Sequence, residues 1–419
     1  MTPVWPLSPR LFRASVLFSA TLFFSSEMAL AQFTQQGPRL VGTDAVGAAQ
    51  QGFSVALSAD GNTATMGGPG DNSGAGAAWV FTRSGRAWTS RKLVGTGAVG
   101  PARQGFSVAL SGDGNTAIVG GLDDNSGAGA AWIFTRNGGI WSQQGSKLVG
   151  IGAATKAGQG SSVALSADGN AAIVGGPGDG GAVWIYTRSG GAWSQQGSKL
   201  VGTGAVGNAG QGISVALSAD GNTAIVGGPQ DASYIGAAWV YTRNGGVWSQ
   251  QGRKLAAINA GTAAGQGWSV ALSADGNTAI VGGPNGQTGA AWVYTRNDGV
   301  WSQQGGKLPA NDAAGPTFQG NSVALSAEGN TAIVGGFYDN AGIGATWVYT
   351  RSGSIWSQQG RKLVGTNAVG NAQQGYSVAL SADGNTAIVG GPDGQTGAAW
   401  VFVQPSRPTI KGAQPALRR

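Results

Sequence analysis

The side chains that could perform chemistry in this chain of 419 residues are few in kind. The sequence contains no His and no Cys, so Ser-His-Asp triads, Cys-His pairs and His-ligated metal sites are excluded. Its Glu residues are Glu27 and Glu328 alone, so a carboxylate pair for glycoside hydrolysis would have to consist of Asp residues. Because the sequence offers no convergent catalytic pair, we expect a protein that is not an enzyme and that uses no cofactor.

The Asp residues fall mostly into two recurring sets. The first set lies in an Asp-Gly-Asn hairpin motif, where turn chemistry explains a carboxylate. We expect these carboxylates to pair with the Arg that closes a later strand of the same unit, such as Arg83 or Arg243, at a gain of about 0–1 kcal/mol if exposed. The members of the first set are Asp60, Asp113, Asp168, Asp220, Asp275 and Asp383, with Glu328 in the remaining unit.

The second Asp set lies in a Gly-rich loop. Its carboxylates either support the turn or form a polar or metal-dependent ligand site. A metal is the weaker interpretation, because calcium prefers about six to eight oxygen ligands and no unit supplies more than two nearby acids. The members of the second set are Asp71, Asp124, Asp179, Asp231, Asp339 and Asp393.

The most variable residue in an otherwise regular repeat is the one that follows each Gln-Gly pair. These residues are Phe53, Phe106, Ser161, Ile213, Trp268, Asn321 and Tyr376. Tyr234 and Tyr338 vary in a nearby loop, as do Arg103, Lys156, Phe318 and Phe337. Aromatic side chains beside Asn, Gln and Asp suit sugar stacking or a protein hot spot, whereas relaxed packing at the end of a repeat would also permit the variation. We expect Phe53, Phe106, Ile213, Trp268, Asn321, Tyr376, Tyr234 and Tyr338 to form a ligand-binding surface.

The elements that must position these residues follow from an internal repeat. The string Ser-Val-Ala-Leu-Ser occurs seven times, at spacings of 52 to 55 residues. A period near fifty with strand-like alternation is typical of β-propeller blades. Each unit has four predicted strands, for example 53–58 in the first unit and 222–229, 236–243 and 247–255 in the fourth.

The seventh unit ends without a fourth strand, and the chain begins with one. Residues 33–41 resemble the fourth strands that start at Trp141, Trp193 and Trp248. A ring allows this N-terminal strand to complete the last blade and removes both terminal edges. We therefore predict an all-β, seven-bladed propeller of four-stranded antiparallel blades over residues 32–405. Once-per-blade Trp residues such as Trp239 and Trp248 are expected to pack between blades.

The cations recur as regularly as the strands do. Each unit has a Lys on its fourth strand, at Lys92, Lys147, Lys199, Lys254, Lys307 and Lys362, with Arg39 in the N-terminal fragment. A cation on an outer strand protects an exposed edge against pairing with another chain. The isoelectric point of 9.8 therefore reflects dispersed charge, and no basic stripe predicts nucleic-acid binding.

The chain ends carry targeting and tail signals. Arg10 and Arg13, an apolar run and a small-residue site ending at Ala31 predict a secretory signal peptide over residues 1–31. No later segment is apolar enough to span a bilayer, so we expect a secreted, periplasmic or cell-surface protein, and a monomer. Residues 406–419 are basic and contain Pro, which predicts a disordered tail.

The ordered motif from Gln51, "QGFSVALSADGNTATMGGPGDNSGAGAAWVFTRSG", which recurs with small variations and is followed in most units by a string such as "WSQQGSKLVG", resembles the bacterial FG-GAP repeat proteins, relatives of the integrin α-chain propeller. The Gly-Gly pair and the spacing of Tyr241 and Trp248 also resemble kelch repeats more weakly. The chain departs from the FG-GAP pattern in having Gln-Gly for Phe-Gly. Its Ser-Ala-Asp-Gly-Asn-Thr loop also lacks the carboxylates of the integrin calcium loop, so calcium binding is not carried over.

The resemblance implies a non-catalytic binding module that recognises a protein or a cell-surface partner through the loop-rich face. Two alternatives stay open. One is a lectin-like carbohydrate binder, and the other is a hydrolase or lyase that uses Asp and Tyr at the channel mouth. The fold does not distinguish them, because propellers host many functions.

Overall fold

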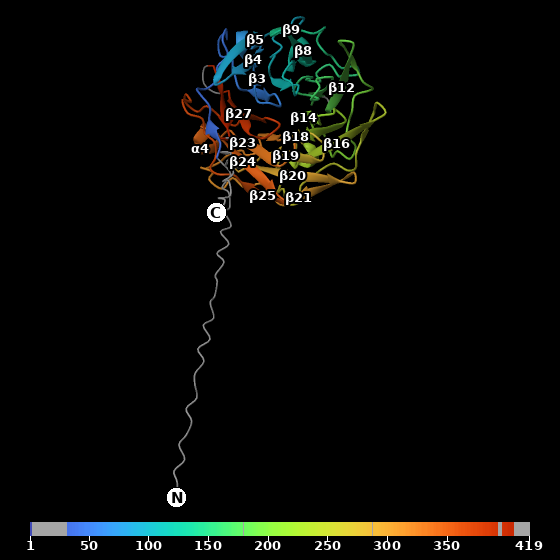
Figure 1. Cartoon of the computed structure of the whole chain (residues 1–419). Helices are drawn as coiled ribbons and strands as arrows, with labels where there is room; N and C mark the ends of the chain where they lie inside the picture. The colour runs from blue at the N-terminus through green and yellow to red at the C-terminus, as the bar shows by residue number, and fades with distance from the viewer. Residues whose placement is uncertain (2–31, 179, 287, 393–395, 406–419) are drawn as a thin grey trace, which may run out of the picture. The chain divides into compact units, whose positions relative to one another are not determined.

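A computed structural model describes residues 1, 32–178, 180–286, 288–392 and 396–405. The predicted signal peptide beyond Met1 and the predicted tail lie outside these residues. Within residues 32–405 the chain forms seven four-stranded antiparallel sheets arranged as the blades of a ring (Figure 1). The predicted seven-bladed β-propeller is confirmed.

Each blade runs outward from the ring axis through four strands. The innermost strands are β2 (Ser54–Leu57), β6 (Ser107–Leu110), β10 (Ser162–Leu165), β14 (Ser214–Leu217), β18 (Ser269–Leu272), β22 (Ser322–Leu325) and β26 (Ser377–Leu380), which begin blades 1 to 7 in that order. The second strands are β3 (Thr63–Gly68), β7 (Thr116–Gly121), β11 (Ala171–Gly176), β15 (Thr223–Gly228), β19 (Thr278–Gly283), β23 (Thr331–Gly336) and β27 (Thr386–Gly391). The third strands are β4 (Ala77–Ser84), β8 (Ala130–Asn137), β12 (Ala182–Ser189), β16 (Ala237–Asn244), β20 (Ala290–Asn297), β24 (Ala345–Ser352) and β28 (Ala398–Val403). The fourth strands are β5 (Ala87–Leu93), β9 (Ile140–Gln143), β13 (Ala192–Gln195), β17 (Val247–Gln250), β21 (Val300–Gln304), β25 (Ile355–Gln358) and, for blade 7, β1 (Thr34–Gln35).

The N-terminal strand closes the ring as the repeat count predicts. Strand β1 pairs antiparallel with β28, with Thr34 opposite Val403, and the pairing resumes where Leu40 bridges to Ala399. The fourth strands are shorter than predicted, because most of them contain two extra residues that interrupt the hydrogen-bond ladder, such as Gln251 and Gly252 in blade 4. The pairing then resumes at a single bridge, as between Leu255 and Ala238. Strand β5 lacks these two residues and runs unbroken to Leu93.

The core lies between blades. The third-strand Trp residues are buried, and six of the seven indoles donate a hydrogen bond to the segment that precedes their blade; for instance, Trp239 Nε1 donates to the carbonyl of Thr203 at 2.8 Å. Gly202 allows this close approach, because a Cβ on it would lie 2.3 Å from the indole ring. The fourth-strand Trp residues also pack against these cores, as predicted, although all except the buried Trp141 are half-buried. Trp248 is half-buried, 5.7 Å beneath the Arg243 guanidinium, and donates to Gln196 of the previous blade at 3.0 Å.

The hairpins between the first and second strands bind one another around the ring. Each hairpin donates a backbone N–H to the carbonyl of the next, from Ala59 to Gly112 and onward until Ala382 returns to Ala59, at 2.8–2.9 Å throughout. Seven backbone hydrogen bonds therefore form a closed circle. We call the end of the ring that carries them the hairpin face and the opposite end the loop face.

The hairpin carboxylates stabilise their own turn. Asp60 accepts hydrogen bonds from Ser58 Oγ at 2.6 Å and from the backbone and side chain of Asn62, both at 2.9 Å. The predicted Asp–Arg pair is replaced by a relay, because Arg83 donates to Asn62 Oδ1 at 2.9 Å. The longer Glu328 departs from the pattern, with Asn330 Nδ2 at 3.4 Å from its carboxylate.

Candidate functional site

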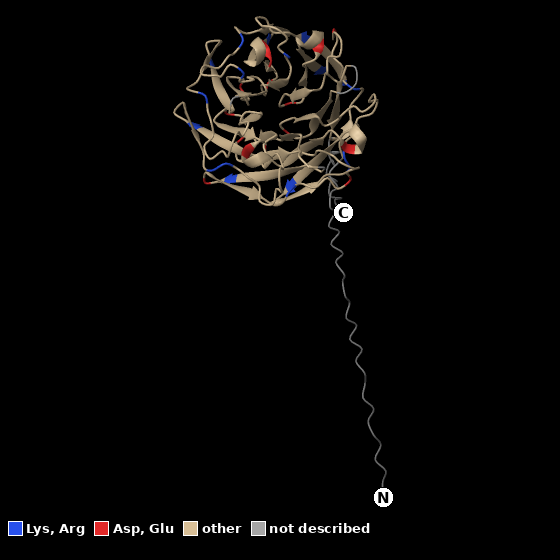
Figure 2. Cartoon of the chain, turned by 180° about the vertical axis from the view of Figure 1, so that it is seen from behind, with Lys and Arg blue, Asp and Glu red and all other residues tan. Residues whose placement is uncertain are grey.

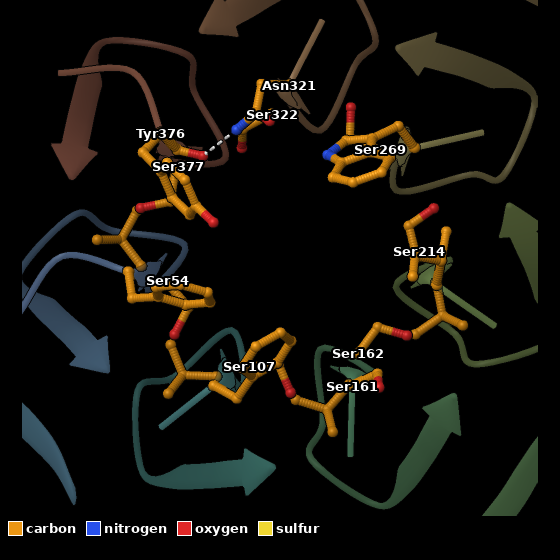
Figure 3. A pocket seen from close by; sticks show the side chains of 18 of the residues that line it. Ser54, Ser107, Ser161, Ser162, Ser214, Ser269, Asn321, Ser322, Tyr376 and Ser377 are labelled. Atoms are coloured by element: carbon orange, nitrogen blue, oxygen red, sulfur yellow. Dashed lines mark hydrogen bonds between the residues drawn. The ribbon is translucent and has the colours of Figure 1, made fainter. Parts of the chain in front are cut away.

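A pocket of about 580 Å³ opens at the ring axis on the loop face. It is lined by the first two residues of each innermost strand and by the residue before them, so every blade contributes the same three positions. Figure 3 shows the labelled serines and Asn321 and Tyr376 arranged around this opening. The structure brings together the predicted residues Phe53, Phe106, Ile213, Trp268, Asn321 and Tyr376, with Ser161 completing the ring. Their role as a ligand site stays a prediction.

Two predicted residues lie away from this pocket. Tyr234 is 55% exposed at the end of α3 (Asp231–Tyr234), and Tyr338 is 43% exposed immediately before α4 (Asp339–Gly342). The equivalent loops of blades 1 and 2 contain the helical turns α1 (Asp71–Gly74) and α2 (Asp124–Gly127). These loops stand on the loop face but outside the rim of the pocket.

The serines below the rim hold neighbouring blades together. Ser54 Oγ donates to the Gly105 carbonyl of the next blade at 2.9 Å, and the same bond recurs from Ser107, Ser162, Ser214, Ser269 and Ser377. Gly67 allows this approach, because a Cβ on it would lie 1.9 Å from the Gly105 oxygen. The remaining serine, Ser322, instead accepts from the backbone N–H of Val378 at 3.0 Å. The lower wall of the pocket is therefore a structural seam.

One half of the loop face carries a continuous series of aromatic rings, which we call the aromatic arc: Phe106, Phe53, Tyr376, Phe337, Phe318 and Tyr338. Successive ring centroids lie 4.8, 4.9, 5.6, 5.4 and 5.6 Å apart. Such tilted and edge-on arrangements at 4.5–7 Å are favourable. The first three rings line the pocket. The other three lie outside the pocket and extend the aromatic arc across the loops of blade 6.

The electrostatics of the pocket depend on one residue. Arg103 is the single charged side chain among the described residues that line it, and its guanidinium lies 5.3 Å from the Phe106 ring. Asp123 approaches Arg103 at 3.7 Å, with both side chains more than a third exposed. Burial raises the pKa of Tyr376 above its usual value, and the positive charge of Arg103 opposes that rise. The Tyr376 phenol is therefore neutral at physiological pH.

The opposite half of the rim is more open. Trp268 is 43% exposed, whereas Asn321 is half-buried and donates through Nδ2 to the Tyr376 carbonyl at 2.8 Å (Figure 3). Ser161 and Ile213 are the rim residues of blades 3 and 4, which lie between the blades of Phe106 and Trp268. The pocket thus has an aromatic side and a side of mixed residue types, although the seven blades around it have the same backbone arrangement.

The Gln of each Gln-Gly pair has a structural role that the sequence did not reveal. Gln51 is fully buried; its Oε1 accepts from the Gly42 N–H at 2.6 Å, and its Nε2 donates to the Gly42 carbonyl at 3.0 Å. The same two-point contact joins Gln104, Gln211 and Gln374 to the residue nine positions earlier. In blade 6, Gln319 Nε2 donates instead to the Tyr349 hydroxyl at 2.6 Å. The constant spacing of nine residues was the available signal.

The second Asp set is buried and paired with the fourth-strand Lys. Asp124 is 1% exposed, accepts from the Val99 N–H at 2.8 Å and binds Lys147 Nζ at 2.6 Å. Equivalent ion pairs are Lys92–Asp71, Lys254–Asp231 and Lys362–Asp339. The prediction that these four lysines guard an exposed edge is therefore wrong, because their ammonium groups neutralise carboxylates inside the blade. Asp179 and Asp393 lie outside the described residues.

The paired carboxylates are not arranged to hold a metal. Within the described part of the chain, no group of three or more His, Cys, Asp or Glu side chains comes together as a metal site. Figure 2 shows Lys and Arg spread around the ring. The same described residues include no helix with the length and apolarity needed to cross a bilayer.

The fold and the axial pocket define the class of protein, a seven-bladed β-propeller of four-stranded blades. No protein-family model matches the chain, and no curated protein matches its sequence. The FG-GAP resemblance is thus unconfirmed and stays a prediction. Among solved structures, the chain is similar to a Kuenenia stuttgartiensis hydrazine synthase chain, with a TM-score of 0.54 and 13% identity over 87% of this chain and 97% of that one. At this identity the similarity supports the fold alone.

Proposed function

We propose that the protein is a secreted, non-catalytic binding module that recognises a protein or cell-surface partner through the loop face. One observation carries the proposal: the seven rim positions carry six different residue types while the surrounding positions repeat. Blade packing requires the repeated residues, since the Gln, Ser and Gly beside each rim residue all join adjacent segments. The rim residue has no equivalent shared role, so it is the position free to serve a ligand.

The form and lining of the pocket fit recognition. Ligand pockets span roughly 300–1,000 Å³ and combine apolar walls with a few polar groups, and this pocket of about 580 Å³ falls in that range. Half-buried Phe53, Phe106 and Tyr376 are side chains of the kind that dominate binding energies at interfaces. The hydroxyls below the rim are engaged in blade-to-blade hydrogen bonds, which disfavours a role for them in catalysis.

Carbohydrate recognition is the second candidate, and the exposed indole of Trp268 favours it. An indole face at a pocket rim suits stacking against a sugar ring, and Asn321 and Tyr376 offer polar groups across the opening. A sugar ligand would depend on Trp268, whereas a protein partner would depend more on the aromatic side.

The proposal is tested by two parallel screens of residues 32–419, one against surface proteins and one on a glycan array with calcium or with chelator. We expect a partner whose affinity falls at least about tenfold in Tyr376→Ala, the loss of a central hot-spot residue. Arg86→Ala is the matched control, because Arg86 is exposed in the β4–β5 hairpin on the opposite face.

The outcomes separate the candidates. Sugar binding that disappears in Trp268→Ala would establish the carbohydrate alternative. A partner that binds the Tyr376→Ala and parent chains equally but is lost in Arg86→Ala would contradict the use of the loop face.

A further inference from the structure

The residue before each Gln-Gly pair has a backbone conformation that favours Gly. Its φ lies between 53° and 67° in all seven blades, and its carbonyl accepts the N–H of the rim residue three positions later, as from Phe106 to Arg103 at 3.1 Å. Blades 3, 4 and 5 place Gly158, Gly210 and Gly265 there. The other four blades place a side chain there: Gln50, Arg103, Phe318 and Gln373.

These four strained residues are neighbours in the ring. They belong to blades 6, 7, 1 and 2, and blade 7 meets blade 1 where Ser377 Oγ donates to the Gly52 carbonyl at 2.8 Å. A residue with a Cβ pays a conformational cost in the left-handed region that Gly avoids. Three blades show that Gly satisfies the fold at this position, so the four side chains need another reason. Strain of this type concentrates at ligand sites.

The strained half of the ring coincides with the aromatic arc. Phe318 is itself a member of the arc, and Arg103 covers its first ring, Phe106. The rim residues of the same four blades include Phe53, Phe106 and Tyr376. Of the four left-handed residues, Arg103 lines the pocket itself and Phe318 extends the aromatic arc beside it.

The charge on this half of the pocket selects among ligands. Aromatic rings alone would suit a quaternary ammonium group. Arg103, however, already lies over Phe106 and repels a second cation, and no carboxylate among the described residues lines the pocket to offset it. The nearest acid, Asp123, is solvent-exposed at 3.7 Å and competes with a ligand for the guanidinium. Arg is well suited to pair with a carboxylate.

We propose that this half of the pocket binds a flat, apolar or aromatic group that carries a carboxylate, with the ring against the exposed sides of Phe53, Phe106 and Tyr376 and the carboxylate on Arg103. The inference rests on the proposed function and names the chemistry that the loop face recognises. Such a group occurs as a free aromatic acid or as the C-terminal aromatic residue of a partner chain. Both present the same planar ring and anionic oxygens to the site.

Calorimetric titration of residues 32–419 tests the inference with matched probes. 2-Naphthoate and its neutral amide share a ring and differ in charge, and phenyltrimethylammonium reverses the charge. Acetyl-Gly-Gly-Trp with a free or an amidated C-terminus distinguishes a peptide source from a free acid. We expect 2-naphthoate to bind at least about tenfold more tightly than the amide, as a charge-assisted hydrogen bond allows.

Two substitutions identify the residue responsible. Arg103→Gln should reduce the acid-to-amide ratio to below about twofold, and Asp123→Asn should tighten 2-naphthoate by removing the competing carboxylate. Equal binding of acid and amide, no binding of 2-naphthoate, or tighter binding of the ammonium probe would overturn the inference. A protein partner that still needed Tyr376 in that case would leave the proposed function standing.

A stability measurement tests the strain argument separately. Arg103→Gly should melt at the same temperature as the parent or higher while losing the preference for the acid. Gln50→Gly is the matched control, expected to melt higher with the preference intact. A lower melting temperature for both Gly variants would show that these side chains stabilise the fold. That result would contradict the inference that they are present to bind a ligand.

Discussion

Buried Lys–Asp ion pairs fix the loop between the second and third strands in four of the blades. Asp124 illustrates the arrangement, because one carboxylate oxygen accepts a loop N–H while the other binds Lys147. The Lys side chain is about four-fifths buried, so the pair is shielded from water on both sides. Removing one partner of such a pair leaves an uncompensated buried charge, which costs far more than losing a surface ion pair.

Substitution of Lys147 by Met should therefore lower the free energy of unfolding by about 3 kcal/mol. Lys307→Met provides the control, since Lys307 occupies the equivalent position in blade 5 but is exposed and faces a loop with Gly286 at the Asp position. The control should change stability by less than about 0.5 kcal/mol. Urea unfolding of both variants makes the comparison, and similar losses in the two would refute the assigned role.

The hairpins repeat one hydrogen-bonded turn, and its carboxylates link stability to pH. Burial raises the pKa of Asp275, but hydrogen bonds from Ser273 and Asn277 and the charge of Arg296 outweigh it, so the net pKa is lowered. The equivalent Ser and Asn hydrogen bonds also outweigh burial and lower the pKa values of Asp60, Asp113, Asp168, Asp220 and Asp383. A carboxyl whose pKa is lower in the folded state stabilises the fold above its unfolded pKa, near 4.

The unfolding free energy should accordingly fall as pH decreases from about 5 through 4 and below, because the unfolded chain takes up protons first. Asp275→Asn should reduce the dependence of the unfolding free energy on pH by the contribution of one hairpin carboxylate. Urea unfolding at several pH values between 3 and 6 measures both curves. Stability that was constant or increased on acidification would contradict the assigned hydrogen bonds.

The sequence predicted the blades and their closure well, because strand alternation and a fixed period are local signals. It failed where a side chain contacts a distant residue. Lys147 looked like edge protection, since its partner Asp124 lies in a separate loop. Gln51 looked like a departure from a family motif, whereas it binds the backbone of Gly42.

The pocket was predictable in position but not in composition. Phe53 and Trp268 stand at repeat-equivalent positions, so divergence between units located the rim. The arc needed the structure, because the Phe337–Tyr376 contact joins different blades. Tyr234 lies outside this pocket, because its helical turn carries it outward to an exposed position on the loop face, and its part in a ligand-binding surface stays a prediction.

At the scale of the whole molecule, closure converts seven similar units into one asymmetric surface. The aromatic arc crosses the junction of the first and last blades, where Tyr376 and Phe53 lie 4.9 Å apart. The N-terminal strand completes blade 7, and blade 7 lies against blade 1 at this contact. Ring closure therefore supports both the fold and the proposed binding site.

The central claim is that residues 32–42 hold this ring together. Phe33 and Leu40 are buried in the core, and Leu40 exchanges two backbone hydrogen bonds with Ala399 at 2.7 and 3.1 Å. Burying a Phe and a Leu stabilises by about 1.5–3 kcal/mol each, so their loss together with the strand should be severe. Phe33→Ala should produce a smaller loss of about 3 kcal/mol.

The most direct measurement is thermal unfolding of residues 32–419 beside residues 43–419, with Phe33→Ala as the intermediate case. We expect the shortened chain to melt far below the full ring, or to unfold in more than one step, with the point variant between them. Melting of the shortened chain within one or two degrees of the full ring would contradict closure by the N-terminal strand.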